Sequence, residues 1–417
     1  MDTSVFERYE SEVRSYCRSF PTVFSKAKGS ILTDSDGKRY IDFFCGAGAL
    51  NYGHNNETIK RRVIEYLEND GVTHALDMYT EAKRDFIDCF EQRVLIPRGL
   101  DYKLQFAGPT GTNAVEAALK LARKVKKRSN VFALMGCFHG MTLGALSLTP
   151  DAVSRAGAGV SLHDVTHIPA PYMFPGLDVP AYMQRLVDDD HSGVDKPAAL
   201  ILETVQAEGG VYVFDNNFLR GAEKFCRDND ILLIVDDIQV GCARTGTYFS
   251  FERAGIVPDI TVMSKSIGGY GMPFSLVLLK PELDLWLPGE HNGTFRGYQP
   301  SMVAAKAGIE VMLNDRAEER ARRAGERIGA FMENELLPMD PRLAARGIGC
   351  IWGVDMAAFG PGKAKAVSRN CFENGLIVEL AGRDNSVVKL MPQLLISDAE
   401  LDEGHSIQKA AVAAVIA

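Results

Sequence analysis

Two charged side chains of opposite sign each follow a short apolar run near the middle of this 417-residue chain. Residues 231–235 are followed by Asp236 and Asp237, and residues 260–263 are followed within two positions by Lys265. Short apolar runs bounded by turn residues are typical of strands buried in a parallel sheet. Because open α/β sheets bind ligands at the carboxyl ends of their strands, we expect the acid and the lysine to share one site.

A carboxylate and a lysine at one site suit the chemistry of pyridoxal phosphate. Lys265 can form a Schiff base with that cofactor, and Asp236 can keep the pyridine nitrogen protonated so that the ring accepts electrons. The alternative for either residue alone is a surface lysine or an acid that caps a helix. The two residues together favour the cofactor hypothesis.

Two further turns suit a phosphorylated, planar ligand. Gly111 and Thr112 lie between a predicted strand, residues 102–106, and a predicted helix, residues 114–125. Free backbone N–H groups and the helix dipole favour phosphate at such a turn. Phe138 follows the next predicted strand and could stack on a planar ring, although a lone phenylalanine is more often part of the core.

Composition narrows the class of protein. The net charge is -8 with a pI of about 5.6, which argues against a broad nucleic-acid surface. No apolar run approaches the ~20 residues of a membrane-spanning helix, and the charged N-terminus has no apolar signal core. Eight dispersed cysteines indicate reduced thiols and neither disulfides nor a metal site. We expect a cytoplasmic protein without membrane or nucleic-acid partners.

The order of elements predicts an α/β fold. Strands and helices alternate over residues 100–280, which favours a mostly parallel sheet. We also expect one helix over residues 4–20, a hairpin over residues 29–44, and one long helix from residue 301 towards 333. The predicted organisation is an N-terminal segment of the small domain, a large cofactor-binding domain, and a connecting helix with the rest of the small domain, at residues 1–55, 56–300 and 301–417.

These motifs together resemble those of the class III (ω-type) aminotransferases, which are fold-type I pyridoxal phosphate enzymes, over nearly the whole chain. The resemblance implies a large domain with a mostly parallel, seven-stranded sheet and a smaller α+β domain. It also implies a homodimer or a dimer of dimers. The matching residues are Thr110-Gly111-Thr112, Phe138-His139-Gly140, Asp236-Asp237-Ile238-Gln239, Arg244-Thr245-Gly246, Ser264-Lys265 and Gly293-Thr294-Phe295.

The resemblance also implies a role for each matching residue. Lys265 would be the Schiff-base lysine and Asp236 the partner of the pyridine nitrogen. Phe138, followed by His139, would stack on the cofactor ring. Gln239 would lie near the phenolic oxygen of the cofactor. Thr294, in the last of these motifs, would reach the phosphate of the cofactor in the neighbouring subunit. The Gly111-Thr112 turn would bind the phosphate of the cofactor in its own subunit.

Within the class, the chain most resembles the diaminobutyrate–2-oxoglutarate aminotransferases of the ectoine pathway. This implies transfer of the terminal amine of L-2,4-diaminobutyrate, to or from aspartate 4-semialdehyde, with 2-oxoglutarate or glutamate as partner. Two departures are Tyr298-Gln299, where the pattern has Asn-Asn, and Ala243, where it has glycine. The stretches that carry the resemblance are residues 108–123, 234–246, 264–271 and 288–297.

A lysine occupies the place where many class III enzymes hold the 2-oxoglutarate carboxylate with an arginine. Lys389 offers a point charge instead of a bidentate fork, and Glu208 matches the family's gate glutamate that pairs with this cation. An ordinary ion pair is the alternative for these two residues. The alternatives for the whole chain are another class III ω-amine aminotransferase with an ornithine, polyamine or β-amino acid donor, a decarboxylase or aminomutase of the same fold, and a catalytically silent relative.

Overall fold

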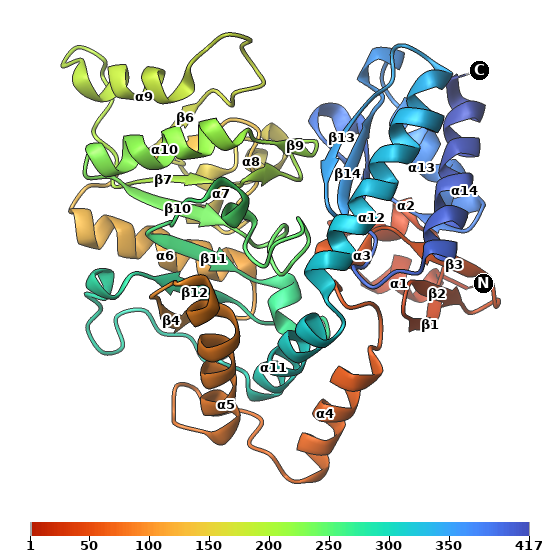
Figure 1. The fold of residues 1–417 in the computed structure, drawn as a ribbon, viewed down its shortest axis with the longest axis horizontal. Helices are drawn as coiled ribbons and strands as arrows, with labels where there is room; N and C mark the ends of the chain where they lie inside the picture. Colours follow the sequence, from red (N-terminus) through yellow and green to blue (C-terminus); the bar gives the residue numbers. More distant parts are fainter. Residues whose placement is uncertain (1, 417) are drawn as a thin grey trace.

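The computed structural model describes residues 2–416 and contains a seven-stranded sheet, which lies on the left of Figure 1. The strands are β4 (Lys103–Phe106), β5 (Val131–Leu134), β6 (Val165–Ile168), β7 (Ala199–Leu202), β10 (Leu232–Asp236), β11 (Ile260–Met263) and β12 (Leu276–Leu279). Their order is β4-β12-β11-β10-β7-β5-β6. Within this sheet β12 alone runs antiparallel to its neighbours. The prediction of a mostly parallel sheet is confirmed.

Both faces of this sheet are buried, which explains why its strands are uninterrupted apolar runs. In β10, Leu232 and Ile234 pack with the helix α6 (Gly111–Lys126) on one face. Leu233 and Val235 point to the opposite face, where they share a core with α10 (Asn216–Asp228). A strand between two helical layers has no solvent-facing side and therefore carries no polar alternation.

A group of helices packs together at one side of the sheet, at the bottom of Figure 1. It contains α4 (Glu57–Glu68), α5 (Glu81–Phe90) and α11 (Gln299–Asn314). The Asn56 side chain accepts hydrogen bonds from the first N–H groups of α4, and Thr80 does the same for α5, as N-cap residues commonly do. Both helices are predicted by the sequence. However, α5 ends five residues before the predicted end at Leu95, and residues 91–95 form a short π-helix instead.

The prediction of one long helix from residue 301 to 333 is wrong. The chain forms α11 and then a separate helix, α12 (Ala317–Phe331). Arg316 lies between them with φ +51°, a left-handed conformation that terminates a helix. The break redirects the chain, so that α11 packs on α4 and α5 whereas α12 packs in the C-terminal region.

The C-terminal region is a second, antiparallel sheet of order β13-β14-β17-β16. Helices α12, α13 and α14 lie with it on the right of Figure 1. The single strand predicted over residues 376–379 is divided between two sheets, because β15 and β16 pair with different partners. The elements are β13 (Ala344–Ile348), β14 (Ile351–Asp355), α13 (Lys363–Glu373), β15 (Leu376–Ile377), β16 (Glu379–Ala381), β17 (Val387–Leu390) and α14 (Asp398–Ile416).

The N-terminal strands complete the same side of the molecule. The strands β1 (Phe24–Lys28), β2 (Ile31–Asp34) and β3 (Arg39–Asp42) form an antiparallel meander, and β15 joins β3 in parallel. The predicted hairpin is confirmed, with Gly37 at φ +87° in its turn. Ile41 and Asp42 pair with Leu376 and Ile377. The division of the chain near residues 55 and 300 stays a prediction.

The predicted helix over residues 4–20 is wrong. The chain forms two short helices, α1 (Ser4–Tyr9) and α2 (Tyr16–Ser19), separated by non-helical residues. Neither helix buries a residue, so no apolar face stabilises one continuous helix, and isolated short helices are marginal in water. Phe20 anchors the end of this segment in a small core with Tyr40 and Phe372.

None of the helices between residues 2 and 416 is long and apolar enough to cross a membrane.

The remaining α-helices and strands are short elements that connect those described above. The connecting elements are α3 (Cys45–Gly48), α7 (Leu143–Leu148), α8 (Ala152–Ala156), α9 (Val179–Asp188), β8 (Val205–Gln206) and β9 (Tyr212–Val213).

Candidate active site

Polar side chains gather where the parallel strands end. Asp236 is the last residue of β10, Glu203 follows β7, and Lys265 follows β11 by two residues. Because β10 pairs in parallel with both β7 and β11, these three ends lie at one edge of the sheet. The structure therefore brings Asp236 and Lys265 together, as their positions after neighbouring buried strands predict.

Lys265 is held in a constrained conformation. It opens a 3-10 turn, Lys265–Gly268, with φ +54°, a left-handed backbone that costs a non-glycine residue about 1–3 kcal/mol. Burial lowers the pKa of its amine and Lys389 adds to this effect, whereas Glu208, Glu379 and Asp236 oppose it. Within residues 2–416 no hydrogen bond or ion pair engages the ammonium. A buried lysine with a lowered pKa is suited to act as a nucleophile and a base.

Asp236 is ionically paired with a buried histidine. The Asp236 carboxylate lies 2.7 Å from Nδ1 of His139 and accepts a second hydrogen bond from the Ile238 N–H. Burial alone would lower the pKa of His139, but Cys137 and the bond to Asp236 raise it well above its usual value. The bond to His139 holds the Asp236 side chain in place at the end of β10. Asp236 is only 4% exposed, so its charge acts in a poorly solvated site.

The N-terminus of α6 forms a cradle for an anion. The Asn113 side chain oxygen accepts hydrogen bonds from the N–H and the hydroxyl of Thr110. This arrangement orders the turn and leaves the N–H groups of Gly111 and Thr112 at the open end of the helix. A Cβ atom at Gly111 would lie 2.8 Å from the Ile238 side chain. Glycine is therefore required for the close approach of the turn to the loop that follows β10.

Phe138 presents an open ring at the same edge. Its side chain is 36% exposed, and its N–H donates a hydrogen bond of 3.0 Å to Glu203. Burial raises the pKa of Glu203 to about 7. A half-exposed aromatic ring, fixed through its backbone, can stack on a planar ligand.

The predicted gate pair is present, with a third partner. Nζ of Lys389 lies 2.7 Å from Glu208 and 3.0 Å from Glu379. Gln239 donates a hydrogen bond to Glu208 and accepts one from Lys389. Burial would lower the pKa of Lys389, but the two glutamates outweigh burial and raise it. Glu379 is not among the residues predicted from the sequence, where its only signal is its position ten residues before Lys389.

A Gly-rich loop is fixed against the lysine turn. The Ser266 hydroxyl donates to the carbonyl of Gly48, and the Asn51 N–H donates to that hydroxyl. The Asn51 side chain oxygen in turn accepts two hydrogen bonds from Arg244, which is fully buried. Ala243 adopts φ +74°, a left-handed backbone that glycine adopts at a lower cost.

The comparison with protein families identifies the class. The family described as Aminotransferase class-III matches residues 14–412. The chain belongs to this family. Its fold matches that of an ornithine aminotransferase from Toxoplasma gondii with a TM-score of 0.86 and 25% identity, over 99% of this chain and 93% of that one.

Two relatives in sequence carry the same name. A diaminobutyrate–2-oxoglutarate transaminase from Nocardia farcinica is 52% identical over 99% of this chain and 94% of that protein. A diaminobutyrate–2-oxoglutarate transaminase from Vibrio parahaemolyticus is 48% identical over 99% of this chain and 98% of that protein.

This class III aminotransferase uses pyridoxal phosphate, and the site fits that cofactor. The N–H groups of Gly111 and Thr112 lie at the open N-terminus of α6, where a phosphate can accept hydrogen bonds. The Phe138 ring is exposed. Nε2 of His139 has no hydrogen-bond partner within the described chain, and the Lys265 amine has none either. The cofactor's phosphate, flat ring and aldehyde each have a chemically suitable counterpart.

Thr294 is the one predicted cofactor residue that the structure does not bring to this edge. It lies exposed in the loop that precedes α11, beside Phe295, whose ring contacts His74. Gln299, the first residue of α11, is buried. It accepts a hydrogen bond from Thr80 and donates one to the Gly297 carbonyl. Gln299, one of the residues that differ from the family pattern, therefore links the start of α11 to the start of α5 and does not contact the Lys265 site.

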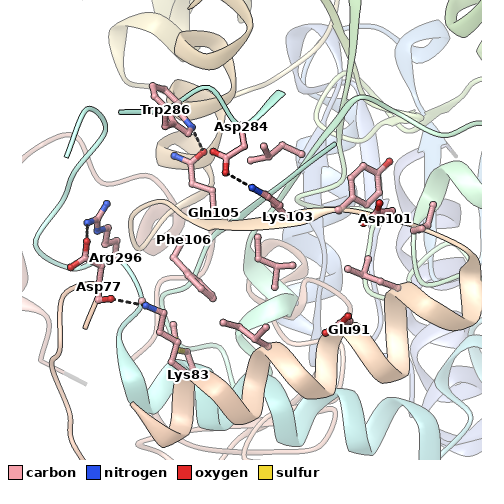
Figure 2. Close-up of a pocket in the computed structure, with 18 of the residues that line it drawn as sticks. Asp77, Lys83, Glu91, Asp101, Lys103, Gln105, Phe106, Asp284, Trp286 and Arg296 are labelled. Carbon is pink, nitrogen blue, oxygen red and sulfur yellow. Dashed lines mark hydrogen bonds and ion pairs between the residues drawn. The ribbon is translucent and has the colours of Figure 1, made fainter. Parts of the chain in front are cut away.

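A large hollow in this aminotransferase lies elsewhere. It has a volume of about 760 Å³ and borders the edge strand β4 (Figure 2). Lys103 pairs with Asp284 across it at 2.9 Å, and Arg296 pairs with Asp77 at its other end. None of the predicted site residues lines it, so it is not the site of amine transfer.

Proposed function

We propose that this enzyme transfers the terminal amine of L-2,4-diaminobutyrate to 2-oxoglutarate, giving aspartate 4-semialdehyde and glutamate, in either direction. The observation that carries this proposal is the 48–52% identity, over nearly full length, to transaminases named for these substrates. We place the reaction in ectoine biosynthesis, as in the subfamily that the motifs resemble. A cytoplasmic location agrees with eight unpaired cysteines in the described chain.

Lys265 is the proposed catalytic base and acid. When bound, pyridoxal phosphate supplies an electron sink for the negative charge that forms at the donor carbon beside the transferred nitrogen. Nζ of Lys265 would hold the cofactor, and the same amine would move a proton at that carbon. The burial that lowers its pKa increases the fraction of free amine available for this transfer.

The surrounding residues orient and stabilise the cofactor in this proposal. Asp236, held in place by His139, would be the partner of the ring nitrogen. Phe138 would stack on the ring, and the N–H groups of Gly111 and Thr112 would hold the phosphate. Gln239, whose amide contacts Glu208, would lie near the phenolic oxygen.

Lys389 and Glu208 allow one site to accept two substrates. The donor must enter with its terminal amine first, so that its α-ammonium and α-carboxylate point outward. While the donor is bound, Glu208 covers Lys389. 2-Oxoglutarate needs a cation for its α-carboxylate, so Glu208 must release Lys389 in the second half-reaction. Lys389 is fully buried whereas the side chain of Glu208 is 30% exposed, so Glu208 is the partner that can move.

We also propose that two chains complete each site. Met78, Tyr79 and Phe295 are 60%, 100% and 60% exposed, and the salt bridge between Arg296 and Asp77 places their loops side by side. Large apolar side chains grouped on loops are typical of a subunit interface. Thr294 lies in one of these loops and would reach the phosphate in the partner subunit.

The assembly is tested by sedimentation under assay conditions and by Thr294→Ala. We expect a dimer or a dimer of dimers, and weaker cofactor affinity in the variant with the covalent bond retained. A fully active monomer would refute the shared site.

The substrate is tested with diaminobutyrate labelled with ¹⁵N on one nitrogen. We expect label from the 4-amino group to appear in glutamate and label from the 2-amino group to stay in the product. Label from the 2-amino position would overturn the regiochemistry. Absence of diaminobutyrate turnover beside brisk turnover of ornithine, putrescine or β-alanine would assign the enzyme another donor within the class.

A further inference from the structure

Lys389 has two carboxylate partners that differ in how firmly they are held. The side chain of Glu379 is 8% exposed and that of Glu208 is 30% exposed. Glu379 lies on β16 directly opposite Lys389 on β17 in the antiparallel register. Glu208 lies in the turn after β8 and reaches Lys389 only through its side chain. The strand register therefore fixes one partner and leaves the other free to rotate away.

A tyrosine from the N-terminal segment holds the fixed partner. The Tyr16 hydroxyl donates a hydrogen bond of 3.1 Å to Oε1 of Glu379, while Oε2 of Glu379 faces Lys389. The Tyr16 ring packs 5.1 Å from that of Phe44. Oε1 of Glu379 thus accepts a hydrogen bond, whereas Oε2 has the ion pair with Lys389 and no hydrogen-bond partner in the described chain. Tyr16 and the strand register together hold this carboxylate beside Lys389.

From this geometry we infer that Glu379 is a positioning residue, the permanent counter-ion of Lys389, and that substrates exchange only for Glu208. The inference deepens the proposed function and rests on it for the identity of the exchanging carboxylate. In each half-reaction Lys389 keeps one resident carboxylate and binds one exchangeable carboxylate, either Glu208 or that of the acceptor.

The resident carboxylate matters most while the exchange takes place. When Glu208 leaves, Lys389 would be a bare, fully buried ammonium if Glu379 were absent, and an unpaired buried charge is strongly unfavourable. Glu379 keeps the ammonium neutralised during this interval. It therefore speeds the exchange, but it changes acceptor affinity little, because it repels Glu208 and the incoming carboxylate to a similar degree.

The test compares Glu208→Gln, Glu379→Gln and Tyr16→Phe in the holoenzyme. One measurement is calorimetric binding of glutarate, a dicarboxylate that cannot react. The other is the single-turnover rate of the 2-oxoglutarate half-reaction. We expect Glu208→Gln to bind glutarate at least tenfold more tightly. Glu379→Gln should bind glutarate within threefold of wild type and react with 2-oxoglutarate at least tenfold more slowly, with Tyr16→Phe intermediate in rate.

Two controls keep the result specific. Glu373→Gln removes one exposed carboxylate that pairs with Arg369 and should change neither measurement. Glu379→Asp retains the charge and should recover part of the rate, which a loss of packing would not. Glutarate binding that tightens in Glu379→Gln as it does in Glu208→Gln would show that Glu379 also exchanges, and an unchanged rate would show that it is a spectator.

The outcome does not depend on the natural amino donor, because glutarate binding needs none and the 2-oxoglutarate half-reaction can start from enzyme loaded with pyridoxamine phosphate. If diaminobutyrate proves not to be a substrate while the glutarate and single-turnover results are as expected, the proposed function fails and the role of Glu379 stands.

Discussion

Replacement of Arg244 by methionine tests how the active-site loops are assembled. The Arg244 guanidinium is completely buried and has no carboxylate partner within residues 2–416. It donates hydrogen bonds to the Asn51 side chain oxygen and to the carbonyls of Cys350, at 2.8 Å, and Pro392, at 3.0 Å. One side chain therefore joins the loop after β10, the Gly-rich loop and the C-terminal region.

The size of the effect follows from the three acceptors. Methionine fills a similar volume but leaves three buried oxygens without donors, at about 1–3 kcal/mol each. Removing a buried charge recovers part of this cost, so we expect the free energy of unfolding to fall by about 3 kcal/mol, near the lower end of the range.

The assay is equilibrium urea denaturation followed by circular dichroism. The matched control is Arg227→Met, because the Arg227 side chain is 65% exposed and makes only long ion pairs. The control should lose less than about 0.5 kcal/mol. A loss below about 1 kcal/mol in the Arg244 variant would show that the loops are held by packing and that the guanidinium network is dispensable.

Four further predictions concern single residues at the site. Lys265→Ala should fold, bind the cofactor without a covalent bond and lose turnover, and borohydride labelling of the wild type followed by peptide mapping should mark Lys265 alone. Asp236→Asn should slow proton removal from the donor carbon at least about tenfold in single-turnover kinetics; an unchanged rate would assign that role to another acid. Burial raises the pKa of Asp237 from 3.8 to about 7. Between these two pH values the folded protein keeps a proton that the unfolded chain releases, so this carboxyl makes the protein less stable as pH rises through that window. In Asp237→Asn the fall in Tm across that window should be smaller; an identical pH profile would contradict the raised pKa. Ala243→Gly relieves a left-handed backbone but increases the freedom of the unfolded chain, so its unfolding free energy should differ from wild type by no more than about 1 kcal/mol.

Local sequence predicts the central sheet well because its strands are buried on both faces. Residues 260–263 are predicted and observed as a strand with the same ends, and Asp236 and Lys265 follow from their positions after such strands. The burial that makes each run apolar also makes the first charged residue after it conspicuous. Since parallel strands share one carboxyl edge, the position in sequence is enough to predict the position in space.

The errors lie where tertiary contacts decide between similar local patterns. Residues 301–333 have continuous helical periodicity, but Arg316 adopts a left-handed conformation, because the chain must turn from one packed group of helices to another. Residues 376–379 have the pattern of one strand, but neighbouring sheets divide them. Neither the break nor the division has a proline or glycine to mark it.

Glu379 shows why the charge cluster could be predicted only in part. Lys389 and Glu208 are recognised because they match positions in a family pattern. The pairing of Glu379 with Lys389 depends on the register of β16 and β17, which a local sequence pattern does not specify. A shift of one residue would place Glu379 on the opposite face of its sheet and leave Lys389 with a single, mobile counter-ion. The same register sets the chemistry of the gate, because it determines which of two glutamates is free to give way to a substrate.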